Sequence, residues 1–279
     1  MRAREPCALS RCLVDYDYAL AKTWLPGCSG RNMLRKLFFS FIAVALSACK
    51  QDAFLPKASQ LPARQEQAAS APAAHMREQI AQRNLRWGAP VFLRIFKEEK
   101  LLELWLQKPD GRYTLFKSYP ICTYSGSLGP KTREGDRQAP EGFYAFGRRH
   151  LNPNSQYHLS FNLNYPNAYD RAHGYTGSYL MVHGKCVSIG CYAMGDAQIE
   201  EIYALVEAAL QNGQPFVRAH AFPFRLTDAN LARHGNHGWI AFWQMMKPGF
   251  DYFEKHHIPP EMEVVDGRYQ LKPQAGVAR

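Results

Sequence analysis

The sequence predicts a β-rich α+β domain. Three strand-like runs, at residues 91–96, 101–106 and 113–124, follow one another with short polar turns between them. Strands connected so closely along the chain pair antiparallel. One amphipathic helix pattern then begins at Asp196 and ends before Gly213. Its apolar face is suited to cover one side of a sheet.

The second half of the chain adds short helices to this strand-rich first half. We expect a strand at residues 215–222, helices at 227–234, 239–246 and 250–257, and a hairpin at 263–271. Pro248 and Gly249 are expected to divide the last two helices, because proline disrupts a helix interior. Asp266 and Gly267 form the turn of the hairpin. A small helical subregion near the C-terminal end follows.

The N-terminal part resembles a secretory signal. Residues 1–32 show no periodicity, whereas Met33 opens a basic segment followed by an apolar run at residues 37–46. That run is shorter than the roughly 20 residues that span a bilayer. We therefore interpret residues 33–48 as a signal peptide and residues 1–32 as an extension upstream of the true start, with Met1 left open as the alternative start.

The residues that follow the signal predict an anchored, tethered domain. Leu-Ser-Ala before Cys49 resembles a bacterial lipobox, so Cys49 is expected to carry a lipid. In bacterial lipoprotein sorting, an Asp directly after the lipidated cysteine favours the inner membrane. By this analogy, Lys50 predicts an anchor in the outer membrane, facing the periplasm. We assign residues 49–86 to a tether with a short lead-in helix, 87–272 to the domain and 273–279 to a tail.

Composition limits the partners. The 279 residues carry a net charge of +10, and residues 1–48 hold seven Lys/Arg and three Asp/Glu. A chain that begins at Cys49 therefore keeps +6, which suits an anionic polymer or a membrane surface. The sequence has no basic helix, zinc-finger spacing or aromatic RNA-binding signature, so we predict no nucleic-acid partner.

The segment 181–194 concentrates the residues that carry chemistry. His183 ends a short apolar strand at residues 179–182, and Cys191 follows Gly190 at a bend. A thiol becomes a strong nucleophile when a base removes its proton, and a nearby histidine is the usual base. The backbone N–H groups around Gly190 and Cys191 are suited to hold an oxyanion. The segment therefore predicts covalent catalysis.

The segments around this motif are expected to be irregular. Residues 125–138 are rich in Gly, Lys, Arg and Pro and predict a solvated loop. Residues 151–169, rich in Asn, Pro and Tyr, predict a long loop over the cleft. Within the motif, Val187 and Ile189 suggest another short strand.

The order of the motif resembles a known family. His183-Gly184, followed by Ser188-Ile189-Gly190-Cys191, is similar to the catalytic motif of the YkuD-type L,D-transpeptidases of bacterial cell walls. That family usually has His where Ile189 stands, and a longer spacing than the eight positions from His183 to Cys191. The YafK-like branch of the family shares both departures.

A second segment supports the resemblance. Residues 139–144, Ala-Pro-Glu-Gly-Phe-Tyr, are similar to the Thr-Pro-x-Gly-x-Phe segment of the family, with Ala139 in place of Thr. The resemblance extends over residues 91–271. It implies a mixed or antiparallel β-sandwich with a covering helix after the catalytic cysteine, in agreement with the predicted fold class.

The resemblance also implies roles for individual residues. Cys191 would be the nucleophile, and His183 the proton acceptor and donor. Gly190 would supply a backbone N–H to the oxyanion, Gly184 would orient the histidine, and Ser188 would shape the site.

The implied substrates are peptidoglycan stem peptides. In the YafK-like branch, the implied reaction is hydrolysis of the bond between diaminopimelate and the C-terminal lysine of the major outer-membrane lipoprotein. We expect no cofactor.

Further residues are assigned by chemistry alone. Arg133 and Arg137 are candidates to bind substrate carboxylates, because guanidinium groups bind carboxylates bidentately, and Tyr124 is a third candidate for substrate binding. Four histidines near the C-terminal end match no zinc-binding pattern, so we predict no metal site. These four are His234, His237, His256 and His257.

Cysteine usage fits an oxidising compartment. Behind Cys49, the chain has Cys122, Cys186 and Cys191. Three thiols suggest one disulfide and one free thiol. Our hypothesis is that Cys122 pairs with Cys186 while Cys191 stays reduced.

Three other functions are considered. The same residues would serve a transpeptidase that forms cross-links or attaches the lipoprotein. A lipoprotein that binds peptidoglycan without turnover would need no activated thiol. A thiol-disulfide oxidoreductase is disfavoured, because Cys186 and Cys191 do not form the Cys-x-x-Cys spacing.

Overall fold

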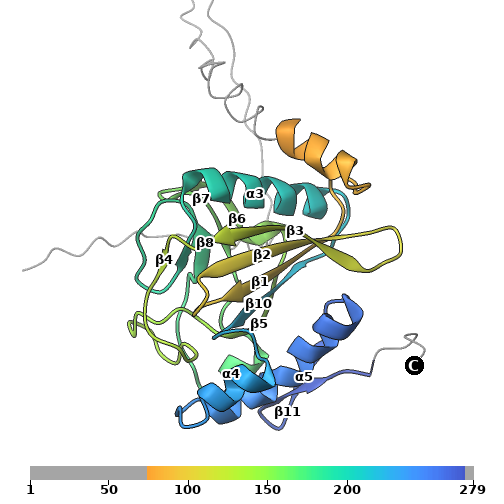
Figure 1. Ribbon diagram of the computed structural model, residues 1–279. Coiled ribbons are helices and arrows are strands. Elements are labelled where there is room, and N and C mark those ends of the chain that lie inside the picture. Colours follow the sequence, from red (N-terminus) through yellow and green to blue (C-terminus); the bar gives the residue numbers. More distant parts are fainter. Residues whose placement is uncertain (1–73, 274–279) are drawn as a thin grey trace, which may run out of the picture. The chain divides into compact units, whose positions relative to one another are not determined.

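The computed structural model describes residues 74–273, whose strands form two five-stranded sheets and one hairpin (Figure 1). The first sheet consists, in spatial order, of β3 (Tyr113–Pro120), β2 (Leu101–Gln107), β1 (Val91–Phe96), β10 (Val217–Phe222) and β5 (Gly142–Phe146). The second sheet consists of β4 (Thr123–Tyr124), β9 (Tyr192–Ala193), β8 (Met181–His183), β7 (His158–Asn162) and β6 (Leu151–Ser155). The hairpin consists of β11 (Met262–Val265) and β12 (Arg268–Leu271).

Both five-stranded sheets are mixed. β1 pairs parallel with β10, and β8 pairs parallel with β9, whereas the other neighbours are antiparallel. Besides a helix at residues 74–82, the structure contains η1 (Arg148–His150), α2 (Ala168–Ala172), α3 (Asp196–Gln211), α4 (Asp228–Arg233) and α5 (Ile240–His256). The predicted β-rich α+β class is confirmed.

Strand β1 explains how the first sheet is covered on both faces. All six of its residues are buried. Val91, Leu93 and Ile95 belong to the main core, whereas Phe92 and Phe96 belong to separate clusters with residues of α5. Because side chains alternate between the faces of a strand, the sheet lies between α3 and α5 (Figure 1).

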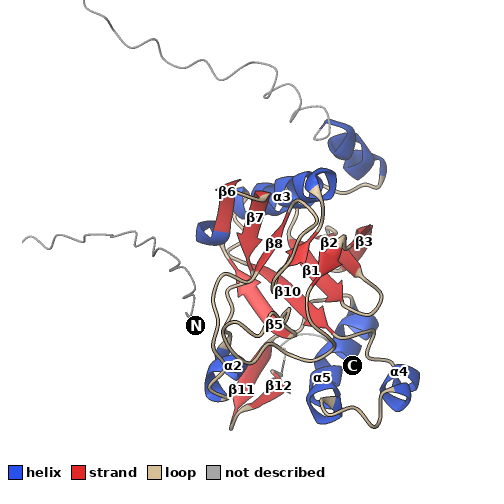
Figure 2. Ribbon diagram, turned by 90° about the vertical axis from the view of Figure 1, so that its left-hand side faces the viewer, coloured by secondary structure: helices blue, strands red, loops and turns tan. Residues whose placement is uncertain are grey.

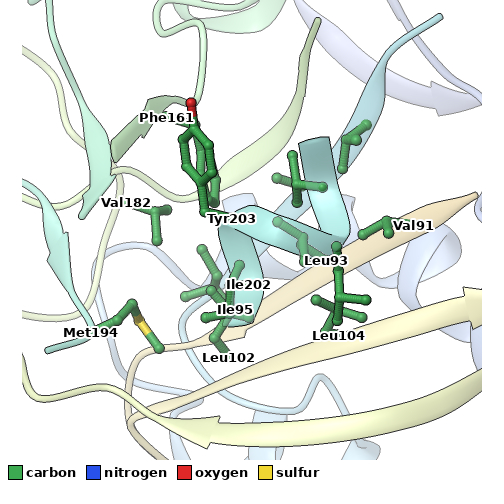
Figure 3. Packing of buried hydrophobic residues seen from close by; sticks show 14 of the residues in the cluster. Val91, Leu93, Ile95, Leu102, Leu104, Phe161, Val182, Met194, Ile202 and Tyr203 are labelled. Atoms are coloured by element: carbon green, nitrogen blue, oxygen red, sulfur yellow. The ribbon is translucent and has the colours of Figure 1, made fainter. Parts of the chain in front are cut away.

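Helix α3 packs against both sheets, as Figure 3 shows. Ile202 and Tyr203 lie between Leu93 of β1 on one side and Phe161 and Val182 of the second sheet on the other. The amphipathic pattern predicted for this segment is therefore the face that joins the two sheets. Burial of such apolar side chains stabilises the domain by about 1.5–3 kcal/mol for each one that is fully buried.

The predicted break at Pro248 is wrong, because α5 continues through it to His256. Met246, Phe250 and Phe253 lie on its buried face, before and after the proline. Packing of one continuous apolar face therefore offsets the lost backbone hydrogen bond. Figure 2 shows α5 beside β12, and α2 beside β11.

The loop predicted at residues 151–169 is also wrong in part. It contains β6, β7 and the start of α2, and Leu151 pairs with Phe161 across the β6–β7 hairpin. Phe161 is fully buried. The Asn-rich sequence gave no strand signal for this hairpin. Most of the β6 side chains are exposed, so apolar and polar residues do not alternate along it.

Two shorter strand predictions also need correction. The run at residues 113–124 is divided into β3 and β4, which belong to different sheets. Val187 and Ile189 lie in no strand; they are exposed residues of a bend, so their apolar character does not reflect burial in a sheet.

The remaining N-terminal predictions fall at or beyond the edge of the described range. Residues 74–82 are helical, and Met76 and Ile80 from this segment are buried in the main core. Within residues 74–273, no helix is both long enough and apolar enough to span a membrane. The predicted signal peptide at residues 33–48 and the lipidation site Cys49 lie outside the described residues.

Candidate active site

A cavity of about 990 Å³ contains both Cys191 and His183. Residues of the loop 125–138, the β6–β7 hairpin, β8 and the bend 187–191 form its walls. This volume lies at the upper end of the range for ligand sites, roughly 300–1,000 Å³. The predicted loop 125–138 and the predicted catalytic motif therefore meet at one cavity.

The two candidate catalytic side chains share a face because of strand register. In the parallel pair β8–β9, Val182 lies opposite Tyr192 and His183 lies opposite Ala193. Val182 and Tyr192 are fully buried in the main core. Since side chains alternate along a strand, His183 and Cys191, which directly precedes β9, point away from that core on the same face.

The Cys191 thiol is half-buried and is the free cysteine among residues 74–273. Its Sγ accepts a hydrogen bond from the Met181 N–H (3.4 Å) and donates one to the Tyr179 carbonyl (3.6 Å). Burial raises the pKa of the thiol, whereas the Met181 N–H and the positive charge of Lys131 act in the opposite direction. In this resting geometry the thiol keeps its proton and points it toward the Tyr179 carbonyl.

His183 is held in one orientation by its own backbone neighbour. Its Nδ1 lies 2.6 Å from the Gly184 carbonyl oxygen. A carbonyl only accepts, so Nδ1 carries the proton and Nε2 keeps its lone pair. Burial lowers the pKa of the imidazole, despite the opposing effect of the Gly184 hydrogen bond. The ring is therefore a neutral base at neutral pH.

Position 184 requires glycine, because neighbouring atoms lie too close to its backbone to leave room for a side chain. A Cβ at this position would lie 2.7 Å from Asp196 Oδ1 and 2.8 Å from the Tyr157 carbonyl oxygen. Asp196 Oδ1 also accepts the Lys185 N–H at 2.7 Å. The start of α3 is thereby joined to the turn that follows His183. Gly195 is the N-cap residue of that helix.

Ser188 organises the bend that carries the thiol. Its Oγ accepts the N–H groups of Gly190 (3.2 Å) and Cys191 (3.0 Å) and donates to the Cys191 carbonyl (2.7 Å). Gly190 holds a φ of +147°, which favours glycine. The two amides expected to bind an oxyanion therefore already donate to Ser188, and an oxyanion would have to replace that contact.

A disulfide joins Cys122, which directly precedes β4, to Cys186 in the turn after β8. The Cys122 N–H also donates to the Ala193 carbonyl at 2.9 Å. The turn between His183 and Cys191 is thus connected covalently to the far edge of its own sheet. The disulfide pairs the two cysteines expected to be bonded and leaves Cys191 free.

The expected substrate-binding residues are only partly brought together. Arg137 lines the cavity, whereas Arg133 and Tyr124 are not among its lining residues. Tyr124 lies instead near Tyr192, with 6.2 Å between ring centroids.

The structure adds a cation that the sequence did not single out. Lys131 is buried, lines the cavity and binds Asp136 at 2.6 Å. Its position in a polar loop gave no signal that the loop folds inward.

Ser160 is a second cavity residue that the sequence did not single out. It lies opposite His183 in the antiparallel pair β7–β8, lines the same cavity and is buried. Within the described residues its Oγ has no hydrogen-bond partner. The sequence offered only a lone serine in a segment predicted to be a loop.

A buried ion pair holds the ends of the loop 125–138. Lys97 Nζ lies 3.0 Å from Glu141 Oε1 and donates to the carbonyls of Gly129 and Ala139, each at 2.9 Å. Glu141 also accepts the Trp243 indole N–H at 2.8 Å. Glu141 therefore anchors the end of this loop to Lys97, which directly follows β1, and to Trp243 of α5. Among residues 74–273, no three His, Cys, Asp or Glu side chains are grouped to hold a metal ion.

Comparisons with known proteins identify the family to which a chain with this fold and this cavity belongs. The family model YkuD, described as the L,D-transpeptidase catalytic domain, matches residues 93–217. A protein of Escherichia coli K12 named "Putative L,D-transpeptidase YafK" is 54% identical over 182 residues, covering 65% of this chain and 74% of that protein. The protein of the same name from Escherichia coli O157:H7 gives the same values. The chain belongs to the YkuD L,D-transpeptidase family.

Solved structures show weaker similarity. The helical cell shape determining protein Pgp2 from Campylobacter jejuni is 18% identical with a TM-score of 0.39, covering 68% of this chain and 80% of that chain. Bd1075 from Bdellovibrio bacteriovorus is 15% identical with a TM-score of 0.35, covering 62% and 76%. The family assignment therefore depends on the sequence relatives.

Proposed function

We propose that this protein is a cysteine-dependent acyl-transfer enzyme that acts on murein peptides in the hydrolytic direction. The bond cut is the amide between diaminopimelate of peptidoglycan and the C-terminal lysine of the major outer-membrane lipoprotein. The observation that carries the proposal is the β8–β9 register, which gives Cys191 and His183 one face in one cavity. Family membership supports a peptidoglycan peptide as substrate, and resemblance to the YafK-like branch supports hydrolysis.

The first half of the reaction forms a thioester. His183 Nε2 takes the proton of Cys191, and Sγ attacks the carbonyl carbon of the amide. The N–H groups of Gly190 and Cys191 hold the oxyanion in exchange for their contact with Ser188. The C–N bond then breaks, and His183 gives its proton to the leaving lysine amine.

The second half restores the enzyme. Water attacks the thioester carbon while His183 accepts one of its protons. The C–S bond breaks, the murein peptide leaves as a carboxylic acid, and Cys191 recovers its proton. An amine in place of water would form a new amide, so the same groups would serve transpeptidation.

We also propose that a lipid on Cys49 holds the enzyme at the outer membrane, facing the periplasm. The lipobox-like sequence before Cys49 supports this location. The tether expected at residues 49–86 would let the domain reach the wall. Incorporation of labelled palmitate into the wild-type chain, and not into Cys49→Ser, is the expected result. Equal labelling of both would contradict it.

Mass spectrometry of murein fragments tests the reaction. Fragments with and without bound lipoprotein peptide are incubated with the chain carrying Cys49→Ser, alone or with Cys191→Ala added. Release of the lipoprotein peptide by the active protein alone is expected. New cross-links or newly attached amines would identify a transpeptidase instead. No change with either protein would favour a lipoprotein that binds peptidoglycan without turnover.

A further inference from the structure

The cavity concentrates exposed apolar side chains. Among the described residues, seven large apolar residues are exposed, and four of them line this cavity. They are Tyr157 (42% exposed), Tyr179 (77%), Val187 (54%) and Ile189 (78%), which we call the apolar rim. Exposed apolar groups that cluster around a site mark an interaction surface.

The apolar rim is not explained by a murein peptide. Such a peptide is rich in carboxylates, which suit the cations that line the cavity, Arg137 and Lys131. Lys131 is already paired with Asp136, and Glu134 also lines the cavity, so Arg137 is the cation best placed to bind a substrate carboxylate. The polar side chains of Asn152 and Asn154 also line the cavity. The carboxylates of the acyl half therefore match Arg137 and these polar side chains, and the apolar rim is left without a matching group on that half of the substrate.

The apolar rim lies close to the groups that handle the amine. The Tyr157 ring lies 4.7 Å from the His183 ring, which would give a proton to the leaving amine. Lys185 Nζ lies 5.7 Å from the Tyr157 ring, which brings the bend 185–189 to the same side. A group that carries the amine to His183 therefore comes close to Tyr157 of the apolar rim.

The backbone conformation of Tyr179 indicates that its side chain is exposed for a function and not by chance. Tyr179 holds a φ of +54°, a left-handed conformation that is rare and strained for a bulky residue. In this conformation its carbonyl accepts from the Cys191 thiol while most of its side chain is exposed. The strained backbone thus belongs to a residue that both contacts the Cys191 thiol and forms part of the apolar rim.

We propose that the apolar rim binds the amine-side partner, a polypeptide with an aromatic or aliphatic residue next to its reacting lysine. This inference rests on the proposed function, but it holds for both directions, because leaving amine and attacking amine occupy the same place. The concave shape of the cavity accepts a peptide segment, whereas a flat bilayer surface would reach only its edge.

Binding without turnover tests the inference. The probes are two fluorescent branched peptides, in which the diaminopimelate of a murein stem peptide is joined to the lysine of a short peptide. One probe has Tyr beside that lysine, and the other has Ser. Their dissociation constants are measured by anisotropy with the full chain carrying Cys49→Ser and Cys191→Ala. We expect the Tyr probe to bind at least about tenfold more tightly.

Variants locate the effect. Adding Ile189→Ser or Val187→Ser is expected to reduce the preference for the Tyr probe to about twofold or less, with the Ser probe bound as before. Both positions are exposed, so the fold is retained. Leu115→Ser is the matched control, because Leu115 of β3 is exposed (39%) and does not line the cavity. It should leave the preference intact.

Equal binding of the two probes would overturn the inference, as would a preference that survives Ile189→Ser and Val187→Ser together. Turnover is measured separately with Cys191 intact. A preference in binding without any cleavage or amide formation would contradict the proposed function and leave this inference standing. Cleavage of both probes at equal rates, together with equal binding, would support the proposed function and contradict this inference.

Discussion

The ring of Tyr157 lies over the imidazole of His183, with 4.7 Å between the ring centroids. Tyr157 comes from the turn between β6 and β7, whereas His183 ends β8. This cover contributes to the burial that lowers the pKa of His183 from its ordinary value of 6.5. In the proposed mechanism the neutral imidazole accepts the thiol proton, so Tyr157 is expected to keep the base active in mildly acidic solution.

Replacing Tyr157 by alanine should therefore change the pH profile. Water would reach His183 and its pKa would rise toward 6.5, so the acid limb of kcat/KM against pH should move to higher pH. Tyr157→Phe keeps the cover and should keep the profile. An acid limb that stays in place in Tyr157→Ala would show that the tyrosine has no effect on the base.

Ser188→Ala should weaken the bend around the nucleophile. It removes the acceptor of two backbone N–H groups and the donor to the Cys191 carbonyl. We expect a loss of about 1–3 kcal/mol in the free energy of unfolding, measured in urea. Ser188→Thr keeps the hydroxyl and should restore most of it. Wild-type stability in the alanine variant would mean that water replaces the hydroxyl.

The ion pair between Lys97 and Glu141 should matter for stability. Both side chains are fully buried. Lys97→Met leaves the carboxylate without its cation, and we expect a loss of about 3–5 kcal/mol in the free energy of unfolding. Adding Glu141→Gln removes the buried charge and should recover part of that loss. If the double variant is less stable than Lys97→Met alone, the penalty is not electrostatic.

Asp170 should make stability depend on pH. Burial raises its pKa from 3.8 to about 6. The folded state thus holds this proton more tightly than the unfolded state, and the resulting stability is present below about pH 4 and lost as pH rises through 6. Between pH 4 and 7.5, wild type should lose up to about 3 kcal/mol relative to Asp170→Asn in urea unfolding. Parallel pH curves for the two proteins would contradict this.

The disulfide predicts the number of free thiols. A chain that begins at Cys49 and carries Cys49→Ser retains Cys122, Cys186 and Cys191. With Cys122 and Cys186 bonded, the denatured, non-reduced protein should show one free thiol, and iodoacetamide labelling should map it to Cys191. Two or more free thiols, or a label at another cysteine, would contradict the pairing.

Most of the regular elements were predictable because their signals are local. The period of α3, the alternation in β1 and β2, and the Asp266-Gly267 turn each depend on residues close together in the chain. The errors arose where distant contacts override local preference. Apolar packing on both sides carries α5 through Pro248, and pairing with β8 orders the polar β6–β7 segment.

Some residues of the candidate site were likewise predictable from local sequence, and others were not. Cys191, His183 and the glycines beside them were recognisable from residue type and order, because a nucleophile and its base have few chemical alternatives. The buried position of Lys131 gave no such signal, since a lysine in a Gly- and Pro-rich loop is usually solvated.

The sequence alone thus determined the element types, the fold class and the two residues suited to covalent chemistry. Only the tertiary structure decided that His183 and Cys191 share a face, that Tyr157 covers the base and that Ser188 occupies the amides near the nucleophile. The physical reason is that strand register, burial and hydrogen-bond partners depend on contacts between segments that local patterns do not relate.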